Sequence, residues 1–326
     1  MALNGMGLER PPGLDLHFMT TAFFSHDDFQ KHNMGAEHPE SPERLIAIIS
    51  YLADMNLGSE LDWVRPEEIT RDQLLKVHPE TYLRQLDMMQ PTQGRVFTDP
   101  DTAMMPHTLR AARLAAGANV QAVDMVLSGQ ATNAFIAARP PGHHAERGKS
   151  MGFCFYNNIA LAAYHALTFH GLERVAIVDF DVHQGNGTVD IVQGDERILM
   201  CSSFQHPFYP HSHVYRQPEN IINSPIMAGT SASDYRKKVE ADWLHKLQDF
   251  KPQLVLVSAG FDSHKLDPMA NLELESADYR WLTDMLTSVA HDTANDRIVS
   301  TLEGGYHLKA LAEGTGAHLE GLVAAG

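Results

Sequence analysis

The chain has 326 residues, 44% of them hydrophobic, and a formal net charge of −16 at pH 7. This size permits one large α/β domain or two ordinary ones. The acidic balance argues against a nucleic-acid partner, because phosphates are bound by clustered Lys and Arg, and no apolar run reaches the roughly 18 residues of a membrane span. The two cysteines, Cys154 and Cys201, exclude a disulfide framework and a thiolate zinc cage. We therefore expect a cytoplasmic protein with reduced thiols and no nucleic-acid or membrane partner.

Apolar β-rich runs alternate with helical patterns along the chain. Residues 1–15 are interpreted as a flexible lead-in without a secretory signal, and strands are predicted at 16–24, 133–138, 174–180, 197–203, 253–259 and 297–302. Helical spacing predicts helices at 107–128, 157–169, 233–249, 276–292 and 308–323, with Asn157 and Ser233 as candidate N-caps. Residues 203–232, rich in Pro, His, Ser and Asn, indicate a long irregular loop. The pattern favours one α/β domain over residues 16–326 with a largely parallel sheet.

Four of these strands are followed by polar side chains. They lead to His143 and His144, to Asp179, Asp181 and His183, to Asp262, and to Tyr306. In open α/β sheets, ligands bind at the carboxyl ends of the parallel strands. The four strand ends therefore predict one site at this edge of the sheet.

Asp179, Asp181 and His183 are spaced two residues apart, which puts them on one side of an extended strand. Uncompensated polar groups would be costly there, and a metal ion would compensate them. Two carboxylates and one imidazole suit zinc or ferrous iron, so Asp181, His183 and Asp262 are the candidate ligands. Three protein ligands leave a position open for water, as in catalytic sites. Asp179 would then orient a histidine.

The remaining polar residues suit acid–base chemistry. Adjacent residues such as His143 and His144 cannot both bind the metal without strain, but histidine titrates near neutral pH and can take the proton of a water molecule. Tyr306 follows two glycines, whose flexibility would let its phenol donate a hydrogen bond to an oxyanion.

The residues named above lie in the motifs RPPGHHAERGKSMGFCFYNN, VDFDVHQGNGT, LVSAGFDSHKLDP and LEGGY, and a weaker motif, HPESPERL, lies at 38–45. These motifs resemble those of the zinc-dependent histone deacetylases, most closely the class II branch and the bacterial histone deacetylase-like amidohydrolases. The resemblance implies the arginase–deacetylase fold, a parallel sheet of eight strands flanked by helices. It also implies hydrolysis of an acetyl-amide, typically on a lysine side chain, with release of acetate.

The same resemblance assigns roles to residues of this sequence. Asp181, His183 and Asp262 fall on the zinc ligands, and Tyr306 falls on the tyrosine that polarises the substrate carbonyl. His144 would act as general base and then acid, with Asn186 beside it, while His143 would stay charged with Asp179 as its partner. A neutral Asn186 should raise the pKa of His144 less than a carboxylate would.

The resemblance further implies a substrate channel and a second ion. Phe153 and Phe208 would wall the channel around the lysine stem, and Gly152 would line its bend. A structural potassium ion would be held by Asp179, Asp181, His183, Ser203 and Phe204, largely through backbone oxygens. Cys154 is interpreted as a packing residue near the channel floor.

Departures from the family pattern concern the channel rim. The sequence YPHSH follows Phe208, where the family usually has a glycine after the proline, and the rim segment 209–230 is shortened. Gln184 replaces a frequent second histidine. Met269 stands where acetylpolyamine deacetylases carry a gatekeeper glutamate, which favours an acetyl-lysine peptide or a small acetyl-amide as substrate.

Other interpretations remain open at this stage. The alternative within the family is an acetylpolyamine or other small-molecule amide deacetylase. An arginase-like ureohydrolase would need a two-metal carboxylate cluster, whereas this chain has Asn186 where a further carboxylate would stand. A catalytically silent binding module predicts the loss of a ligand, a histidine or the tyrosine. The native metal, the acyl-chain preference and a possible homo-oligomeric state stay undecided.

Overall fold

The computed structural model describes residues 20–215 and 218–326. Its centre is an eight-stranded sheet in the order β2-β1-β5-β10-β9-β6-β7-β8, in which every neighbouring pair is parallel. The strands are β1 (Thr21–Phe24), β2 (Leu61–Val64), β5 (Asn133–Ile136), β6 (Val175–Asp179), β7 (Ile198–Gln205), β8 (Ile221–Ile226), β9 (Leu254–Ala259) and β10 (Ile298–Leu302). The prediction of one α/β domain with a parallel eight-stranded sheet is confirmed.

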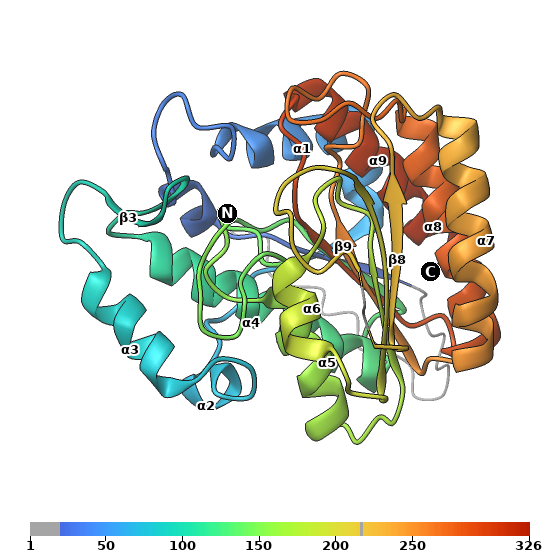
Figure 1. The fold of residues 1–326 in the computed structure, drawn as a ribbon, viewed down its shortest axis with the longest axis horizontal. Helices are drawn as coiled ribbons and strands as arrows, with labels where there is room; N and C mark the ends of the chain where they lie inside the picture. The colour runs from blue at the N-terminus through green and yellow to red at the C-terminus, as the bar shows by residue number, and fades with distance from the viewer. Residues whose placement is uncertain (1–19, 216–217) are drawn as a thin grey trace, which may run out of the picture.

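Helices cover both faces of this sheet (Figure 1). They are α1 (Glu43–Asp54), α2 (Arg71–Leu74), α3 (Glu80–Met89), α4 (Thr108–Ser128), α5 (Asn158–Thr168), α6 (Asn186–Val192), α7 (Ala232–Phe250), α8 (Ser276–Thr293) and α9 (Leu308–Ala325), with 3-10 turns at Asp27–Lys31 and Leu57–Glu60. Helices α7, α8, α9 and α1 pack in succession on one face, and α4, α5 and α6 lie together on the other. Among the described helices, none is long and apolar enough to cross a membrane.

The two helical layers explain why the central strands are mostly apolar. Every residue of β5, β6, β9 and β10 is buried, including the polar ones. A parallel sheet covered on both faces has no solvent side, so its strands form continuous hydrophobic runs. The edge strand β2 has exposed residues instead.

Most predicted helices agree with the structure to within two residues, but one cap was wrong. Asn157 caps α5, because its side chain accepts a hydrogen bond from the Ala160 backbone N–H. Helix α7 begins at Ala232 rather than at Ser233, since the Ser231 side chain accepts from the Asp234 N–H. Two serines two residues apart offer equivalent caps, and sequence spacing cannot choose between them.

The interpretation of residues 203–232 as one irregular loop was wrong. Strand β7 continues to Gln205, and Ile221–Ile226 form β8, which pairs in parallel with β7 at the sheet edge. Its Pro225 hid the strand, although an edge strand tolerates a residue that cannot donate to the ladder. The N-terminal strand is Thr21–Phe24; the predicted lead-in and residues 16–19 lie outside the described residues.

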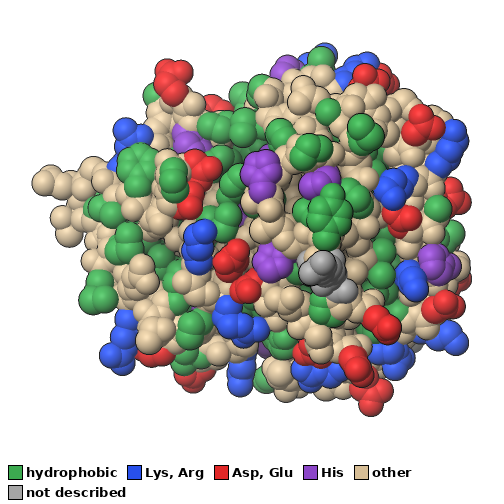
Figure 2. Space-filling view, in the orientation of Figure 1, with side chains coloured by type: hydrophobic (Ala, Val, Ile, Leu, Met, Phe, Trp, Pro, Cys, Tyr) green, Lys and Arg blue, Asp and Glu red, His purple; other side chains and the backbone are tan. Residues whose placement is uncertain are grey.

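The sequence prediction also missed a small hairpin beside the main sheet. Strands β3 (Val96–Asp99) and β4 (Thr102–Met104) pair antiparallel. Figure 2 shows histidine and hydrophobic side chains gathered near the middle of the face seen in Figure 1, with acidic and basic side chains mixed around them. This face therefore carries no large patch of a single charge sign.

Candidate active site

The four strands with polar ends are neighbours at the centre of the sheet. Their order is β5-β10-β9-β6, and all four run in the same direction. The segments that follow them therefore meet at one edge, as the sequence predicted. Three of these segments supply the candidate metal ligands and the two histidines, and the fourth supplies Tyr306.

Asp181, His183 and Asp262 form a buried cluster that fits a divalent cation. Their ligand atoms lie within 4.8 Å of one another. His183 Nδ1 is 3.1 Å from an oxygen of each carboxylate, Asp181 Oδ1 and Asp262 Oδ2. Asp262 Oδ2 is buried, and apart from this contact with His183 it has no polar partner among the described residues. An inward-facing carboxylate oxygen of this kind is what a metal ligand requires.

The charges of the cluster also favour a bound cation. Burial and the neighbouring Asp181 carboxylate raise the pKa of Asp262 to about 7, despite the opposing effect of His183. Burial lowers the pKa of His183, but the two carboxylates outweigh it and raise this pKa to about 10. The carboxylates thus hold a proton on His183 where a metal ion would supply the positive charge.

Glycines make room for the two carboxylates to face each other. A Cβ at position 304 would lie 2.1 Å from Asp262 Oδ2 and 2.5 Å from Asp181 Oδ2. A Cβ at position 260 would lie 2.1 Å from Asp181 Oδ2. The remaining carboxylate oxygens are held by the backbone, since the Gly304 N–H donates to Asp181 Oδ2 and the Val182 N–H donates to Asp262 Oδ1.

The adjacent histidines have different partners and opposite tendencies to bind a proton. His143 Nδ1 lies 3.0 Å from Asp179 Oδ2, and His144 Nδ1 lies 2.7 Å from Asn186 Oδ1. Burial lowers the pKa of His143, but the nearby carboxylates, chiefly Asp179, raise it well above its usual value. Burial and the positive charges of His143 and His183 hold the pKa of His144 well below its usual value.

Glu303 is a buried site residue that the sequence interpretation passed over. Its Oε2 accepts hydrogen bonds from the Gly142 and His143 backbone N–H groups at 2.7 and 3.1 Å. Its Oε1 accepts from the Ser258 hydroxyl. Burial raises its pKa to about 7. The LEGGY motif contained a sequence signal for Glu303. A glutamate at the end of a strand predicted to be buried needs a hydrogen-bond partner.

A cavity of about 200 Å³ leads to these groups. It is lined by Asp101, His144, Gly152, Phe153, His183, Phe208, Tyr209, Met269 and Tyr306. The structure thus brings the predicted channel residues together with Tyr306, His144 and His183. The Phe208 ring stacks on the His183 ring at 5.4 Å.

Asp101 and Tyr209 line the cavity but were missed from the sequence. Asp101 is exposed and follows the β3 strand of the hairpin that was not predicted. The Tyr209 ring lies 5.2 Å from the His144 ring, and its buried hydroxyl has no hydrogen-bond partner among the described residues. Proximity of Tyr209 to the predicted Phe208 was the only signal that could have indicated it.

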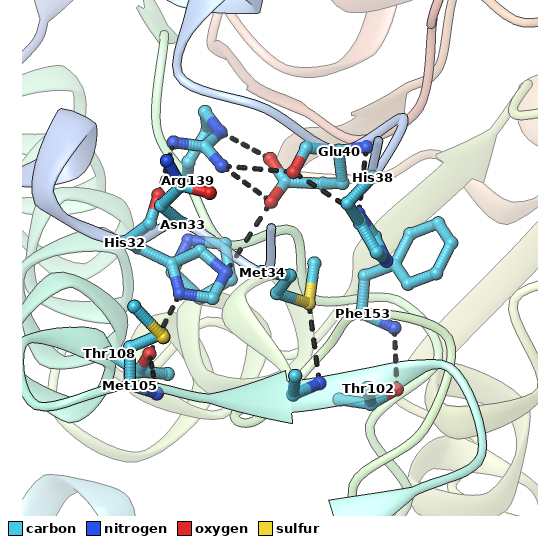
Figure 3. Close-up of polar contacts among 12 residues, drawn as sticks. His32, Asn33, Met34, His38, Glu40, Thr102, Met105, Thr108, Arg139 and Phe153 are labelled. Atoms are coloured by element: carbon cyan, nitrogen blue, oxygen red, sulfur yellow. Dashed lines mark hydrogen bonds and ion pairs between the residues drawn. The ribbon is translucent and has the colours of Figure 1, made fainter. Parts of the chain in front are cut away.

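Two residues that line the cavity have left-handed backbone. Gly152 has φ 55°, and a Cβ there would lie 2.4 Å from His144 Cδ2. Phe153 has φ 69°, which is unusual for a residue other than glycine. Its backbone N–H donates to Thr102 Oγ1, and its ring packs edge-on against His38 at 4.6 Å (Figure 3).

A fully buried ionic network joins the segment around Glu40 to Arg139, in the loop that follows β5 (Figure 3). The Arg139 guanidinium donates to the Glu40 carboxylate and to the backbone oxygens of Phe29 and His32. Burial raises the pKa of Glu40, but Arg139 and His32 outweigh it and hold this pKa well below its usual range. The network fixes the segment around the HPESPERL motif.

The same motif reaches Tyr306. Arg44 donates to the backbone oxygens of Gly305 and Glu303, both at 2.6 Å. Its guanidinium also lies 5.0 Å from the centre of the Tyr306 ring. Asp267 accepts hydrogen bonds from the Tyr306 and His307 N–H groups. The glycine segment that precedes Tyr306 is thus held on two sides.

Other predicted residues have contacts that leave their roles open. Ser203 shares a hydrogen bond with the Tyr235 hydroxyl, and Phe204 is buried in β7. The potassium site that the resemblance implies for them stays a prediction. Cys154 is buried and packs beside Gly152, as expected of a structural thiol. Gln184 donates to the His213 backbone oxygen and takes no part in the metal cluster.

Comparison with known proteins agrees with this geometry. The family model for the histone deacetylase domain matches residues 38–322. The chain belongs to the histone deacetylase family. It is 36% identical to the histone deacetylase-like amidohydrolase of Pseudomonas aeruginosa, over 83% of this chain and 73% of that protein. It is 35% identical to the polyamine deacetylase HDAC10 of Mus musculus, over 90% of this chain but only 47% of that protein.

A solved structure of the family has the same fold. The crystal structure of the HDA15 HD domain superposes with a TM-score of 0.88 at 31% identity, over 94% of this chain and 90% of that chain. The comparisons confirm that the protein is a hydrolase of the deacetylase and amidohydrolase group. They do not decide its substrate within that group.

Proposed function

We propose that this member of the family is a metal-dependent deacetylase that removes acetyl groups from lysine-type side-chain amides. The observation that supports it most is that the cluster of Asp181, His183 and Asp262 reaches, through His183, the cavity that His144 and Tyr306 also line. A zinc or ferrous ion held by the three ligands would polarise the amide carbonyl and lower the pKa of a coordinated water molecule.

The protein's own residues would handle the protons. His144 is held neutral by its buried, cationic surroundings, so its free nitrogen can take the proton of the attacking water and later give it to the leaving amine. His143, kept charged by Asp179, would contribute positive charge beside the developing oxyanion. The Tyr306 phenol stays protonated, because burial raises its pKa well above the usual value, and can donate a hydrogen bond to that oxyanion.

The shape of the cavity supports a substrate with a slender apolar stem. Phe153, Phe208 and Tyr209 present aromatic surfaces, which suit the methylene groups of a lysine side chain. Met269 carries no charge that could attract a secondary ammonium group. We therefore propose acetyl-lysine, in a peptide or a small molecule, as the substrate class.

An acetylpolyamine is the second candidate, because a polyamine deacetylase is among the relatives and Asp101 places one carboxylate at the cavity. An arginase-like activity has less support. Its second metal would need another carboxylate, whereas Asn186 occupies that position and bonds to His144. The silent binding module also lacks support, since every candidate ligand, both histidines and Tyr306 are present.

The test is hydrolysis of a fluorogenic acetyl-lysine peptide by purified protein, with N-acetylputrescine and N-acetylspermidine in parallel. We expect peptide turnover that a chelator abolishes and that Tyr306→Phe lowers by roughly 10²- to 10³-fold, the effect of removing one oxyanion donor. Tyr164→Phe is the matched control, because Tyr164 lies on α5 outside the cavity lining, with its hydroxyl 3.4 Å from the Ile191 backbone oxygen. Turnover of the polyamines alone would replace the proposed substrate class with the second candidate.

A further inference from the structure

A second cluster of potential metal ligands lies outside the active site. Asp124 belongs to the last turns of α4, His165 to the last turn of α5, and His170 to the turn that follows α5. His165 Nε2 and His170 Nε2 lie 2.7 and 2.6 Å from the same oxygen, Asp124 Oδ1. One donor atom from each of the three residues falls within 4.8 Å of the others.

This cluster is separate from the catalytic centre. Helix α5 begins at Asn158, whose side chain contacts the Pro140 carbonyl in the loop that carries His143. His165 lies seven residues further along α5, or roughly 10 Å along the axis at about 1.5 Å per residue. The chain then enters β6 at Val175, so the cluster lies toward the amino ends of the strands. The catalytic residues follow their carboxyl ends.

Neighbouring aromatic rings fix the directions of both imidazoles. His165 is 7% exposed, and its ring stacks on the Phe169 ring at 4.9 Å with an interplanar angle of 12°. The His170 ring packs edge-on against the rings of both His165 and Phe169. Gly171, with φ 71°, reverses the chain after His170. The ring nitrogens are therefore held toward Asp124 before any ligand arrives.

We propose that Asp124, His165 and His170 form a second binding site for a divalent transition metal, with zinc, nickel and copper as the fitting ions. Two imidazole nitrogens and one carboxylate oxygen are the donor set of borderline metals. Calcium and magnesium prefer an all-oxygen set, and the imidazoles disfavour them. The ion would lie between the two Nε2 atoms and the Asp124 oxygen, with each imidazole bound as the neutral tautomer that carries its proton on Nδ1.

The cluster can open to admit such an ion. Zinc binds nitrogen and oxygen at about 2.0 to 2.2 Å, which places tetrahedral donors roughly 3.3 Å apart. The present separations must therefore grow by about half an ångström, and the Asp124 side chain is 43% exposed and free to shift. A cavity of about 340 Å³, lined by Asp124 and His165 together with Gln73, Lys76 and Thr168, borders the cluster. It leaves space for a water molecule or an external ligand on the ion.

The experiment counts bound zinc. Chelator-stripped protein is loaded with Zn²⁺, freed of unbound metal by gel filtration and assayed by mass spectrometry. We expect the wild type to hold one more equivalent per chain than either Asp124→Asn or His165→Ala/His170→Ala, with acetyl-lysine hydrolysis unchanged. Asp124→Asn preserves the size of the side chain and so guards against misfolding. His291→Ala is the matched control, because His291 pairs with Asp296 on the surface and belongs to no three-residue metal cluster among the described residues.

The catalytic cluster is tested separately in a His183→Ala background. In that background, Asp124→Asn should again remove one equivalent of zinc per chain. A wrong assignment of the catalytic metal and a wrong assignment of the second site therefore give different zinc contents. Equal zinc content in the wild type and Asp124→Asn, in both backgrounds, would overturn the second site. So would loss of the same equivalent in His291→Ala.

Discussion

The floor and the rim of the cavity are built in different ways. The floor consists of residues that follow four adjacent central strands, and nearly all of them are buried. The rim comes from the β3–β4 hairpin, from the segment around Phe208 and Tyr209 and from the segment around Met269, and much of it is exposed. Strand ends hold side chains rigidly, whereas loops vary without disturbing a core. The floor should therefore govern the chemistry and the rim the choice of substrate.

The strongest test of this division is His144→Gln. Removing the neutral base at the floor should lower kcat by roughly 10²- to 10⁴-fold, the usual contribution of general acid–base catalysis, with little change in KM. His245→Gln, an exposed histidine on α7, is the control. The measurement is steady-state hydrolysis of an acetyl-lysine peptide. Activity of His144→Gln within a few-fold of the wild type would contradict the assigned base.

The second test concerns the buried ionic network of Glu40 and Arg139. Glu40→Gln should destabilise the fold by about 3 to 5 kcal/mol, because it leaves the buried Arg139 without its compensating charge. Urea unfolding followed by circular dichroism measures this free energy. Glu80→Gln, whose arginine partners are solvent-exposed, should cost far less. Equal losses in both variants would show that the buried network adds no more than a surface pair.

At the rim, Met269→Glu should change selectivity and leave the chemistry intact. A carboxylate here would attract the secondary ammonium of an acetylpolyamine, so its kcat/KM relative to the peptide should rise by about tenfold, the ratio for about 1.4 kcal/mol. Leu266→Glu, on the same segment but outside the cavity lining, is the control. If both substrates slow equally in Met269→Glu, the position affects stability or access rather than recognition.

The smallest predicted effect concerns the pH dependence set by His144 at the floor. His144 must be neutral to act as base, so activity should fall as the pH drops through its pKa. Asn186→Asp adds a carboxylate at 2.7 Å, which raises this pKa and should move the acid limb of the kcat/KM profile upward by about one pH unit. Asn33→Asp adds the same charge at an exposed position and should leave the profile unchanged. A downward shift in Asn186→Asp would argue against His144 as the titrating group.

The sequence anticipated the floor because its signals are local. An apolar run followed by Asp179, Asp181 and His183 is readable without tertiary information, and adjacent parallel strands bring such ends together. The rim gave no such signal. Strand β8 contains Pro225 and depends on pairing with β7, and Tyr209 became part of the cavity through the course of an irregular segment.

The buried ionic network and the second ligand cluster could not be predicted, because each depends on residues that meet only in the folded chain. Glu40 and Arg139 are 99 residues apart, and Asp124 lies 41 residues from His165. No periodicity within a helix links such positions. Their meeting depends on how α4 and α5 pack and on how the segment around Glu40 lies against Arg139 (Figure 3).

The most direct test of the central claim is release of acetate from an acetyl-lysine peptide by chelator-stripped protein, before and after zinc is restored. Because the proposed chemistry depends on the cluster of Asp181, His183 and Asp262, the stripped wild type should be inactive and zinc should restore it. His183→Ala should stay inactive with zinc present. Full activity of the stripped wild type, or equal recovery in His183→Ala, would contradict a metal-dependent deacetylase at the floor of this cavity.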